Sequence, residues 1–433
     1  MTVKAGLPRF LDPGGMFLLG MAVLLTWGQV QQRAAAAKTP AVFAQAGQEA
    51  RMFELLWALG GRMAPKAATA ENPHKNGWNA AVEAVLLAEA GRGPEALSLL
   101  AQTPRGAFHD CWKAAYDSGP MPDAQDVGAA LKGLGGGLAA KYMEASLIES
   151  ADLNSRLAED IRMNALGRFR ERAHAVFGLL FLMFIGAAAG IVLGIRMWVK
   201  RVPPEDTPQF RMAGAAVVRV FLGWYVAFLA SATAAAMING IVPLGVWLLP
   251  LAYALHAAAG LAFLCIAEGA PPARLFDGLC RKNHVWLWGG FKFLLVALGT
   301  ALALTLAISP FMPDGEAPQR ELVELIRSLD GLVPFLAVFF TVAILGPVFE
   351  EVFFRGFLLS ALRRGLPTPW ALALSSALFG AFHLSLTAMP VLAVLGAVMG
   401  LAFLRTGDIR AAIFVHACWN GGVFLFQQLL YGV

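Results

Sequence analysis

The chain has 433 residues, of which 58% are hydrophobic and only 15% are charged. Soluble proteins carry roughly 45–50% apolar and about 25% charged residues. The composition therefore excludes an intrinsically disordered chain, a small disulfide scaffold and a fibrous repeat, and it disfavours a single water-soluble domain. A mean hydropathy of +0.61 indicates a polytopic membrane protein.

The net charge of +5 is explained by membrane topology, because the cytoplasmic loops of membrane proteins collect Lys and Arg. Nucleic acid is therefore not expected as a partner; the lipid bilayer is. With the N-terminus inside, the short cytoplasmic segments hold 13 basic residues, and the short external loops hold two, Arg320 and Arg327. This orientation places residues 33–172 outside the cytoplasm.

The first apolar stretch covers about residues 14–30. It is at the short end of the roughly 17–25 residues that a membrane-spanning helix needs. The pattern predicts an N-terminal transmembrane anchor over residues 1–32. A cleavable signal peptide is the alternative, because a run of alanines at 34–37 follows the apolar stretch.

Residues 33–172 are richer in charge, and Gly and Pro interrupt short helical patterns. The stretch from Trp78 to Gln102 predicts two amphipathic helices that are broken near Gly91 to Pro94. We expect a soluble helical domain here that lies outside the cytoplasm. Its role stays open between recruiting a substrate, binding a partner and a plain structural part.

The rest of the chain, 173–433, is predicted to be a membrane domain of eight helices. The predicted helices cover 174–198, 212–236, 242–266, 285–309, 331–362, 369–387, 389–404 and 410–431. With the N-terminal segment this makes about nine transmembrane helices. The expected fold class is all-α, a polytopic helical membrane bundle with an inserted soluble helical domain. Gly186, Gly190 and Gly194 predict close packing of one helix against a neighbour.

Polar side chains gather on three predicted helices near the C-terminus: Glu350, Glu351 and Arg355 on the first, His383 on the second, and His416 and Asn420 on the third. Ionisable groups are costly within a bilayer, so they usually have a partner or a function. Arg219, His256 and Lys292 are isolated by comparison, and His256 is expected to be a packed residue. The candidate site therefore lies within 331–433.

The spacing of these residues separates the two glutamates. Glu351 and Arg355 are four residues apart and are expected to form a helical ion pair. Glu350 points about 100° away around the helix and has no cation near it in the sequence, which suits a general base. In a helical hairpin Glu350 and His383 lie equally far from the connecting turn, hence at one depth. A single buried ionic cluster with a purely structural role is the alternative.

Two kinds of chemistry fit this set of residues. In the first, Glu350 deprotonates a water that His383 helps to position, and His416 and Asn420 donate hydrogen bonds to an oxyanion. In the second, Glu350, His383 and His416 ligate Zn²⁺, which activates the water. The chain has no HExxH motif, and the residues do not choose between the two alternatives.

The same residues form three motifs in order, EEVFFRG from Glu350, FGAFH from Phe379 to His383, and HACWN from His416 to Asn420. These motifs resemble the EExxxR, FxxxH and HxxxN signatures of the CAAX-protease and bacteriocin-processing (Abi, or CPBP) intramembrane endopeptidases. The resemblance covers 331–433 well, the preceding membrane helices loosely, and residues 1–172 not at all.

The resemblance implies hydrolysis of a peptide bond in a membrane-associated protein or peptide, in a bacterial inner membrane. It makes Glu350 the catalytic base and His383 its helper in activating the water. His416 and Asn420 stabilise the oxyanion, while Glu351, Arg355 and Phe379 support the site. Eukaryotic members of the family cleave prenylated CAAX tails.

Two other functions are compatible with the sequence. A non-catalytic membrane scaffold or self-immunity protein would keep the polar cluster for folding. A proton-coupled transporter would use the buried Glu and His residues as a relay. Transporters are often built from inverted repeats, and the sequence shows no matching pair of interrupted helices.

Overall fold

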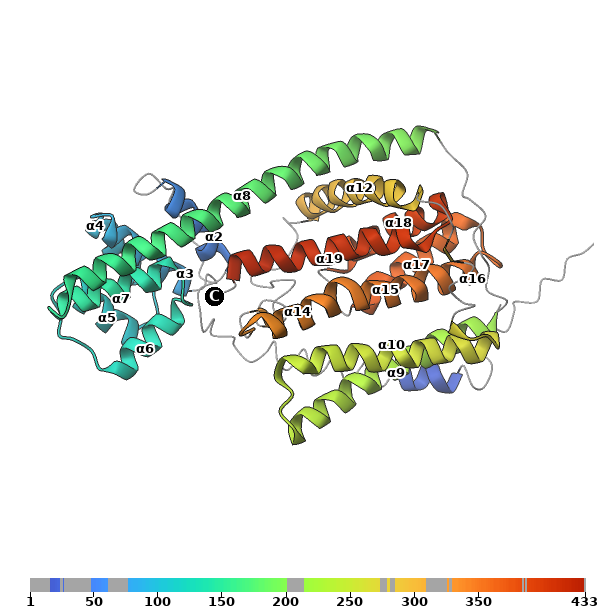
Figure 1. Ribbon diagram of the computed structural model, residues 1–433, viewed down its shortest axis with the longest axis horizontal. Helices are drawn as coiled ribbons and strands as arrows, with labels where there is room; N and C mark the ends of the chain where they lie inside the picture. The colour runs from blue at the N-terminus through green and yellow to red at the C-terminus, as the bar shows by residue number, and fades with distance from the viewer. Residues whose placement is uncertain are drawn as a thin grey trace, which may run out of the picture. The chain divides into compact units, whose positions relative to one another are not determined.

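The computed structural model describes residues 16–23, 26, 48–60, 77–200, 214–272, 279–280, 285–308, 325–326, 329–383, 385 and 388–431. Within these residues all regular secondary structure is helical (Figure 1). Seven of the described helices are long and apolar enough to cross a membrane, and Thr368–Phe382 is a shorter apolar helix. The predicted all-α membrane fold is confirmed. Of the expected N-terminal span at about 14–30, the structure describes residues 16–23 and 26, and the other residues lie outside the described part of the chain.

The chain divides into two compact units. A membrane unit comprises residues 1–36, 182–312 and 317–425, and a helical unit comprises 37–181, 313–316 and 426–433. Helix α8, Ser155–Lys200, is one unbroken helix of 46 residues that contributes to both units (Figure 1). The sequence analysis placed a boundary at 172, where the charge density falls. The helix continues through it because no proline interrupts this stretch.

The helical unit is built from short helices: α2 (Gln48–Gly60), α3 (Gly77–Glu89), α4 (Gly93–Leu100), α5 (Ala107–Tyr116), α6 (Ala124–Gly133), α7 (Leu138–Ser150) and the first part of α8. The pair predicted between Trp78 and Gln102 is α3 and α4. The chain turns between them at Gly91, whose φ of +74° suits glycine.

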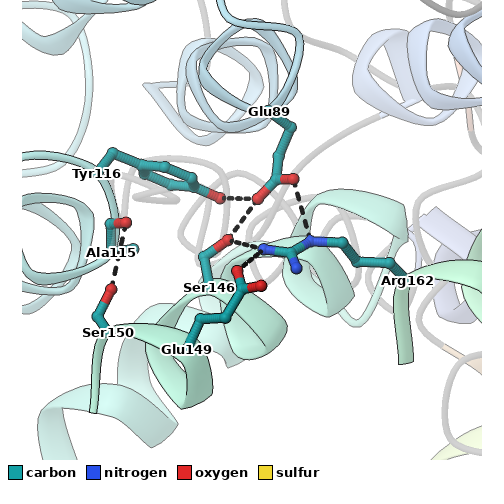
Figure 2. A network of polar contacts seen from close by, with 7 residues as sticks. All are labelled: Glu89, Ala115, Tyr116, Ser146, Glu149, Ser150 and Arg162. Carbon is teal, nitrogen blue, oxygen red and sulfur yellow. Dashed lines mark hydrogen bonds and ion pairs between the residues drawn. The ribbon is translucent and has the colours of Figure 1, made fainter. Parts of the chain in front are cut away.

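A polar network joins four helices of the helical unit, as Figure 2 shows. Glu89 of α3 accepts hydrogen bonds from the Tyr116 hydroxyl at 2.9 Å and from the Ser146 hydroxyl, and its other oxygen accepts from Arg162 Nε at 3.2 Å. Arg162 also donates to Ser146 Oγ at 2.6 Å and to Glu149 at 2.7 Å. Buried polar groups need such partners, so the network fixes α3, α5, α7 and α8 to one another.

The membrane unit contains the longer helices: α9 (Ala215–Ile241), α10 (Leu248–Glu268), α12 (Val285–Ile308), α14 (Leu332–Phe340), α17 (Thr368–Phe382), α18 (Met389–Thr406) and α19 (Ile409–Tyr431). Helix α10 packs against α9, and α18 packs against both α12 and α17 (Figure 1). The second half of α8 packs on α12. A Cβ atom at Gly190 would lie 1.7 Å from the Leu295 carbonyl oxygen, so the close packing predicted for this glycine stripe is confirmed.

The helix that carries both glutamates runs from Leu332 to Leu362, as predicted, but it is not a uniform α-helix. After α14 it contains a π-helical segment, Thr341–Leu345 (η4), then α15 (Gly346–Glu351), a second π-helical segment, Val352–Leu359 (η5), and α16 (Ser360–Leu362). The N–H of Gly346 donates to the Thr341 carbonyl, five residues back. π-Helical turns are rare and are frequent at functional sites.

Helix α17 is shorter than predicted. The sequence analysis extended it to 387, whereas it ends at Phe382, and His383 is its C-cap. Ser385 instead bonds the start of α18 (Met389–Thr406), because its carbonyl accepts the Met389 N–H at 2.9 Å and its hydroxyl accepts the Ala388 N–H at 3.3 Å. A helix of 15 residues is about 22 Å long, less than the roughly 30 Å hydrocarbon core. His383 therefore lies at the end of a helix that is too short to cross the hydrocarbon core by itself.

Candidate active site

A fully buried ion pair forms the base of the site. Arg355 Nη1 donates to Glu351 Oε1 at 2.8 Å, and the two side chains are 1% and 0% exposed. Arg355 Nη2 donates to the Gly396 carbonyl of α18 at 3.0 Å. Its guanidinium carbon lies 4.3 Å from the ring centroid of Phe379 on α17. Charges removed from water need such pairing, and here one arginine connects three helices.

The approach of α18 depends on Gly396. A Cβ atom at this position would lie 3.1 Å from Arg355 Nη2, 3.2 Å from Phe379 Cδ1 and 3.3 Å from the backbone of Ser376. The absence of a side chain thus lets the Gly396 carbonyl reach the guanidinium. The sequence analysis did not assign Gly396 to the site.

His416 contacts both glutamates from α19. Its Nδ1 lies 2.8 Å from Glu351 Oε1, and its Nε2 lies 3.9 Å from Glu350 Oε2. An ionised carboxylate only accepts hydrogen bonds, so Nδ1–H is the donor to Glu351 and Nε2 is the nitrogen that faces Glu350. Glu350 was expected to have no cation near it in the sequence, and the side chain that approaches it, His416, comes from α19 instead.

His383 is oriented by its own helix. Its Nδ1 lies 2.9 Å from the carbonyl oxygen of Phe379, one turn back. A carbonyl can only accept, so Nδ1 carries the proton, and Nε2 of a neutral ring keeps its lone pair. Among the described residues no hydrogen bond or ion pair joins His383 to Glu350. The hairpin register is nevertheless as expected, because Phe354, one turn after Glu350, packs on Phe379 with 5.2 Å between ring centroids.

The ring of Phe379 connects the two histidines. Its centroid lies 5.0 Å from that of His383 and 5.6 Å from that of His416, both in edge-to-face geometry. With Arg355 over the same ring, one phenylalanine contacts three polar side chains of the proposed site. The FxxxH motif therefore positions an aromatic ring among these three side chains as well as an imidazole.

Asn420 reaches a different part of the glutamate helix. Its Nδ2 donates to the backbone carbonyl of Val342 at 3.1 Å. Val342 lies in the π-helical segment η4, two turns before Glu350. Asn420 is four residues from His416, so both side chains leave the same face of α19. One amide N–H of Asn420 thus bonds the backbone of the helix that carries both glutamates.

Two further residues lie near Glu350 on α10. His256 packs on Phe349, the residue before Glu350, and a Cβ atom at Gly346 would lie 2.9 Å from Tyr253 Cε1. His256 is 3% exposed, and its ring packs 4.8 Å from that of Tyr253 and 5.5 Å from that of Phe349. His256 is packed, as expected, but it is not remote from the candidate site. Its three-residue spacing from Tyr253 on one helix face was the available signal.

The proposed zinc ligands do not form a metal site as the structure places them. In the part of the chain that the structure describes, no group of three or more His, Cys, Asp or Glu side chains is arranged to hold a metal ion. Glu350, His383 and His416 therefore lack the convergent geometry of a zinc site. Zinc ligation stays a prediction from the sequence.

Comparison with known proteins gives a match to the segment that contains Glu350, His383 and His416. Residues 332–422 match the family model described as type II CAAX prenyl endopeptidase, Rce1-like. All three motifs lie within the match. Residues 332–422 are thus similar to the CAAX-protease family. The resemblance noted in the sequence is thereby confirmed for this part of the chain, and the CAAX-protease segment includes α14 to α18 and most of α19.

Two curated proteins are similar to part of this chain. The "Putative membrane peptidase YdiL" of Bacillus subtilis (strain 168) is 26% identical over 169 residues, 38% of this chain and 66% of that protein. The "Membrane-embedded CAAX protease MroQ" of Staphylococcus aureus (strain USA300) is 26% identical over 155 residues, 34% of this chain and 60% of that protein. The chain thus spans less than two thirds of the length of either relative. No solved structure matches it.

Proposed function

We propose that the protein is an intramembrane endopeptidase, which hydrolyses a peptide bond of a membrane-associated protein or peptide through a water activated by Glu350 and His383. The observation that carries this proposal is the arrangement around His416. Glu351 holds one nitrogen of the ring at 2.8 Å, so that the other faces Glu350 at 3.9 Å. The motif match to CAAX proteases and their curated names support the same reaction class.

In the first step Glu350 removes a proton from water, and the oxygen attacks the carbonyl carbon of the scissile bond. Nε2 of His383 accepts a hydrogen bond from the same water, because its Nδ1–H is occupied by the Phe379 carbonyl. The distance of 3.9 Å between Glu350 and His416 is longer than a hydrogen bond. Glu350 and His416 therefore do not use up each other's hydrogen-bonding capacity before the substrate arrives.

In the second step the tetrahedral oxyanion receives hydrogen bonds from His416 Nε2–H and from the second amide N–H of Asn420. His416 must then be an imidazolium, since its Nδ1–H is given to Glu351. With Glu350 protonated, the Glu351 carboxylate and the oxyanion balance the charges of Arg355 and His416, which suits a buried cluster. Collapse of the intermediate breaks the C–N bond, and the proton held by Glu350 passes to the leaving amine.

The orientation of the chain is part of this proposal. The basic residues of the short loops favour a bacterial inner membrane with residues 33–172 outside the cytoplasm. The helical unit would then meet substrates or partners on that side. The substrate is a peptide or protein that the bilayer presents to the site.

Expression of the wild-type protein and of Glu350→Gln in one host tests the function without a known substrate. New N-termini in membrane proteins are measured by mass spectrometry in each strain. Glu268→Gln, at the end of α10, is the matched control that removes a carboxylate elsewhere in the membrane unit. We expect neo-N-termini with the wild type and the control, but not with Glu350→Gln.

The same experiment separates the other functions. A non-catalytic scaffold or a transporter would give no neo-N-termini with any of the three proteins. Neo-N-termini that persist with Glu350→Gln would remove Glu350 from the mechanism. Equal amounts of folded protein in the membrane must be shown for all three by detergent extraction and gel filtration.

A further inference from the structure

The π-helical segment η4 leaves one backbone carbonyl without its usual donor. In an α-helix the carbonyl of Val342 would accept from the N–H of Gly346, but that N–H donates to Thr341. In the π-helical register the donor to Val342 would be residue 347, which is a proline and has no N–H. Both backbone donors that helical geometry offers to this carbonyl are therefore lost.

Asn420 supplies the missing donor. Its Nδ2 lies 3.1 Å from the Val342 carbonyl oxygen, and it comes from another helix, 78 residues along the chain. An unpaired carbonyl within a membrane protein costs free energy comparable to a lost hydrogen bond. A side-chain amide on a neighbouring helix is one of the ways in which membrane proteins satisfy such a group.

The π-helical turn decides which way the glutamates face. A turn with i to i+5 hydrogen bonds accommodates one residue more than an α-helical turn. If η4 reverted to α-helix, every residue after it would be rotated by about 100° relative to α14. Glu350 and Glu351, which are 7% and 0% exposed, would then lose their present directions toward α19.

We propose that Asn420 is a positioning residue that replaces the backbone donor missing at Pro347, and thereby holds the π-helical turn that aims Glu350 and Glu351 at His416. Its hydrogen bond to Val342 is separate from the N–H that faces the oxyanion. The consequence for catalysis rests on the proposed function, whereas the coupling between Asn420 and Pro347 does not. The two can therefore be tested apart.

A double-mutant cycle in full-length protein, purified in detergent, tests the coupling. Asn420→Ala leaves the Val342 carbonyl unpaired and should lower the melting temperature by about 2–10 °C. Pro347→Ala restores a backbone N–H beside that carbonyl, so the double variant Asn420→Ala/Pro347→Ala should recover most of the loss. Pro334→Ala combined with Asn420→Ala is the matched control, because Pro334 lies in the first turn of α14, away from Val342, and it should give no recovery.

A second measurement reports the direction of Glu350 without any activity assay. Dicyclohexylcarbodiimide modifies carboxyl groups in apolar surroundings, and mass spectrometry gives the rate at Glu350. We expect Asn420→Ala to change this rate and the double variant to return it to the wild-type value. If Asn420→Ala does not fold, recovery of folded protein in the double variant supports the proposal.

Equal losses of stability with and without Pro347→Ala would overturn the inference, as would a labelling rate at Glu350 that Asn420→Ala leaves unchanged. These results do not depend on proteolysis. A chain in which Glu350→Gln remains active would instead overturn the proposed function, while the Asn420–Pro347 coupling could still be present.

Discussion

Glu351 accepts hydrogen bonds from both Arg355 and His416 through the same oxygen, Oε1, each at 2.8 Å. One carboxylate thus neutralises a buried arginine and fixes the orientation of a candidate catalytic imidazole. Glu350, the adjacent residue, has its ion-pair contact with His416 at 3.9 Å. Of these two neighbouring glutamates, Glu351 therefore has the larger structural role.

This difference predicts opposite effects on stability and on proteolysis for two matched substitutions, Glu351→Gln and Glu350→Gln. Glu351→Gln leaves the buried charge of Arg355 without its partner, which should cost about 3–5 kcal/mol of stability. Glu350→Gln should abolish proteolysis and change stability much less, because no ion pair to Arg355 depends on it in the described part of the chain. Thermal unfolding in detergent, measured beside the neo-N-terminus assay, checks both. A Glu350→Gln variant that is the less stable of the two would contradict the assignment.

Gly396 should not tolerate a side chain. Gly396→Ala places a methyl group 3.1 Å from Arg355 Nη2 and 3.2 Å from Phe379, and overpacking of this kind costs about 1–3 kcal/mol. We expect a lower melting temperature and reduced activity. Gly422→Ala on α19 is the control, since a Cβ atom there meets nothing within 4 Å. Equal behaviour of the two variants would show that α18 can move away from Arg355 at no cost.

The polar network of the helical unit (Figure 2) should respond to alkaline pH. Burial, together with the nearby Glu89 carboxylate, holds the pKa of Tyr116 well above its usual value. A raised pKa means that the folded state keeps the proton longer than the unfolded state. Its contribution to stability is complete below pH about 10, the pKa of an unperturbed tyrosine, and is lost as the pH rises toward the folded pKa.

The test compares melting temperatures of the wild type and Tyr116→Phe at neutral pH and above pH about 10. At neutral pH the variant should be less stable by about 0.5–1.5 kcal/mol, the value of one hydrogen bond. The deficit should shrink as the pH rises, because only the wild type has this phenol to ionise. A deficit that is constant across the pH range would show that Tyr116 titrates normally.

The cysteines provide a test of the orientation. Cys280 is exposed in the connection between α10 and α12, which the charge distribution places in the cytoplasm. Cys111, in the helical unit, is buried, and burial raises its pKa to about 11, so it should be unreactive at neutral pH.

A membrane-impermeant maleimide should therefore label inside-out vesicles and leave intact spheroplasts unlabelled. Cys280→Ser should remove this labelling. Burial also raises the pKa of the Cys280 thiol, so a mildly alkaline buffer increases the rate. Labelling of Cys280 from the outside would reverse the proposed topology and move the helical unit into the cytoplasm.

Proteolysis should survive removal of metal ions. Glu350, His383 and His416 do not form a three-ligand group in the described structure, and the proposed steps need only their proton-transfer and hydrogen-bonding groups. We expect purified protein dialysed against a strong zinc chelator to keep its activity. Loss of activity that added zinc restores would favour the metal alternative, and the zinc content of the active protein would measure its stoichiometry.

Much of the membrane fold could be predicted from hydropathy, because long apolar runs separated by Pro and charged residues leave few alternatives in lipid. The extent of the glutamate helix and the start of α18 agree with the sequence pattern. The end of α17 does not, because Ser385 bonds the N–H groups of Ala388 and Met389 at the start of α18, and periodicity does not report such contacts. The π-helical segments were also missed. In η4 the Val342 carbonyl bonds Asn420 of another helix, a contact that the local sequence does not report.

For the candidate site, motif spacing identified the residues but not their contacts. The Glu351–Arg355 pair was predictable because it is local along one helix. The approach of His416 to both glutamates, the neighbouring Tyr253 and His256, and the hydrogen bond from Asn420 to Val342 are all contacts between helices far apart in the chain. Sequence periodicity gives the face of a helix but not which neighbour it meets.

The position of Phe379 has a mechanical consequence. Because one rigid ring touches His383, His416 and the Arg355 guanidinium, a sideways displacement of α17 by a docking substrate would disturb all three contacts together. His383 and His416, which we propose to activate the water and to hold the oxyanion, could then not be misaligned independently. Activity should thus switch between assembled and disassembled states, with few partly competent intermediates.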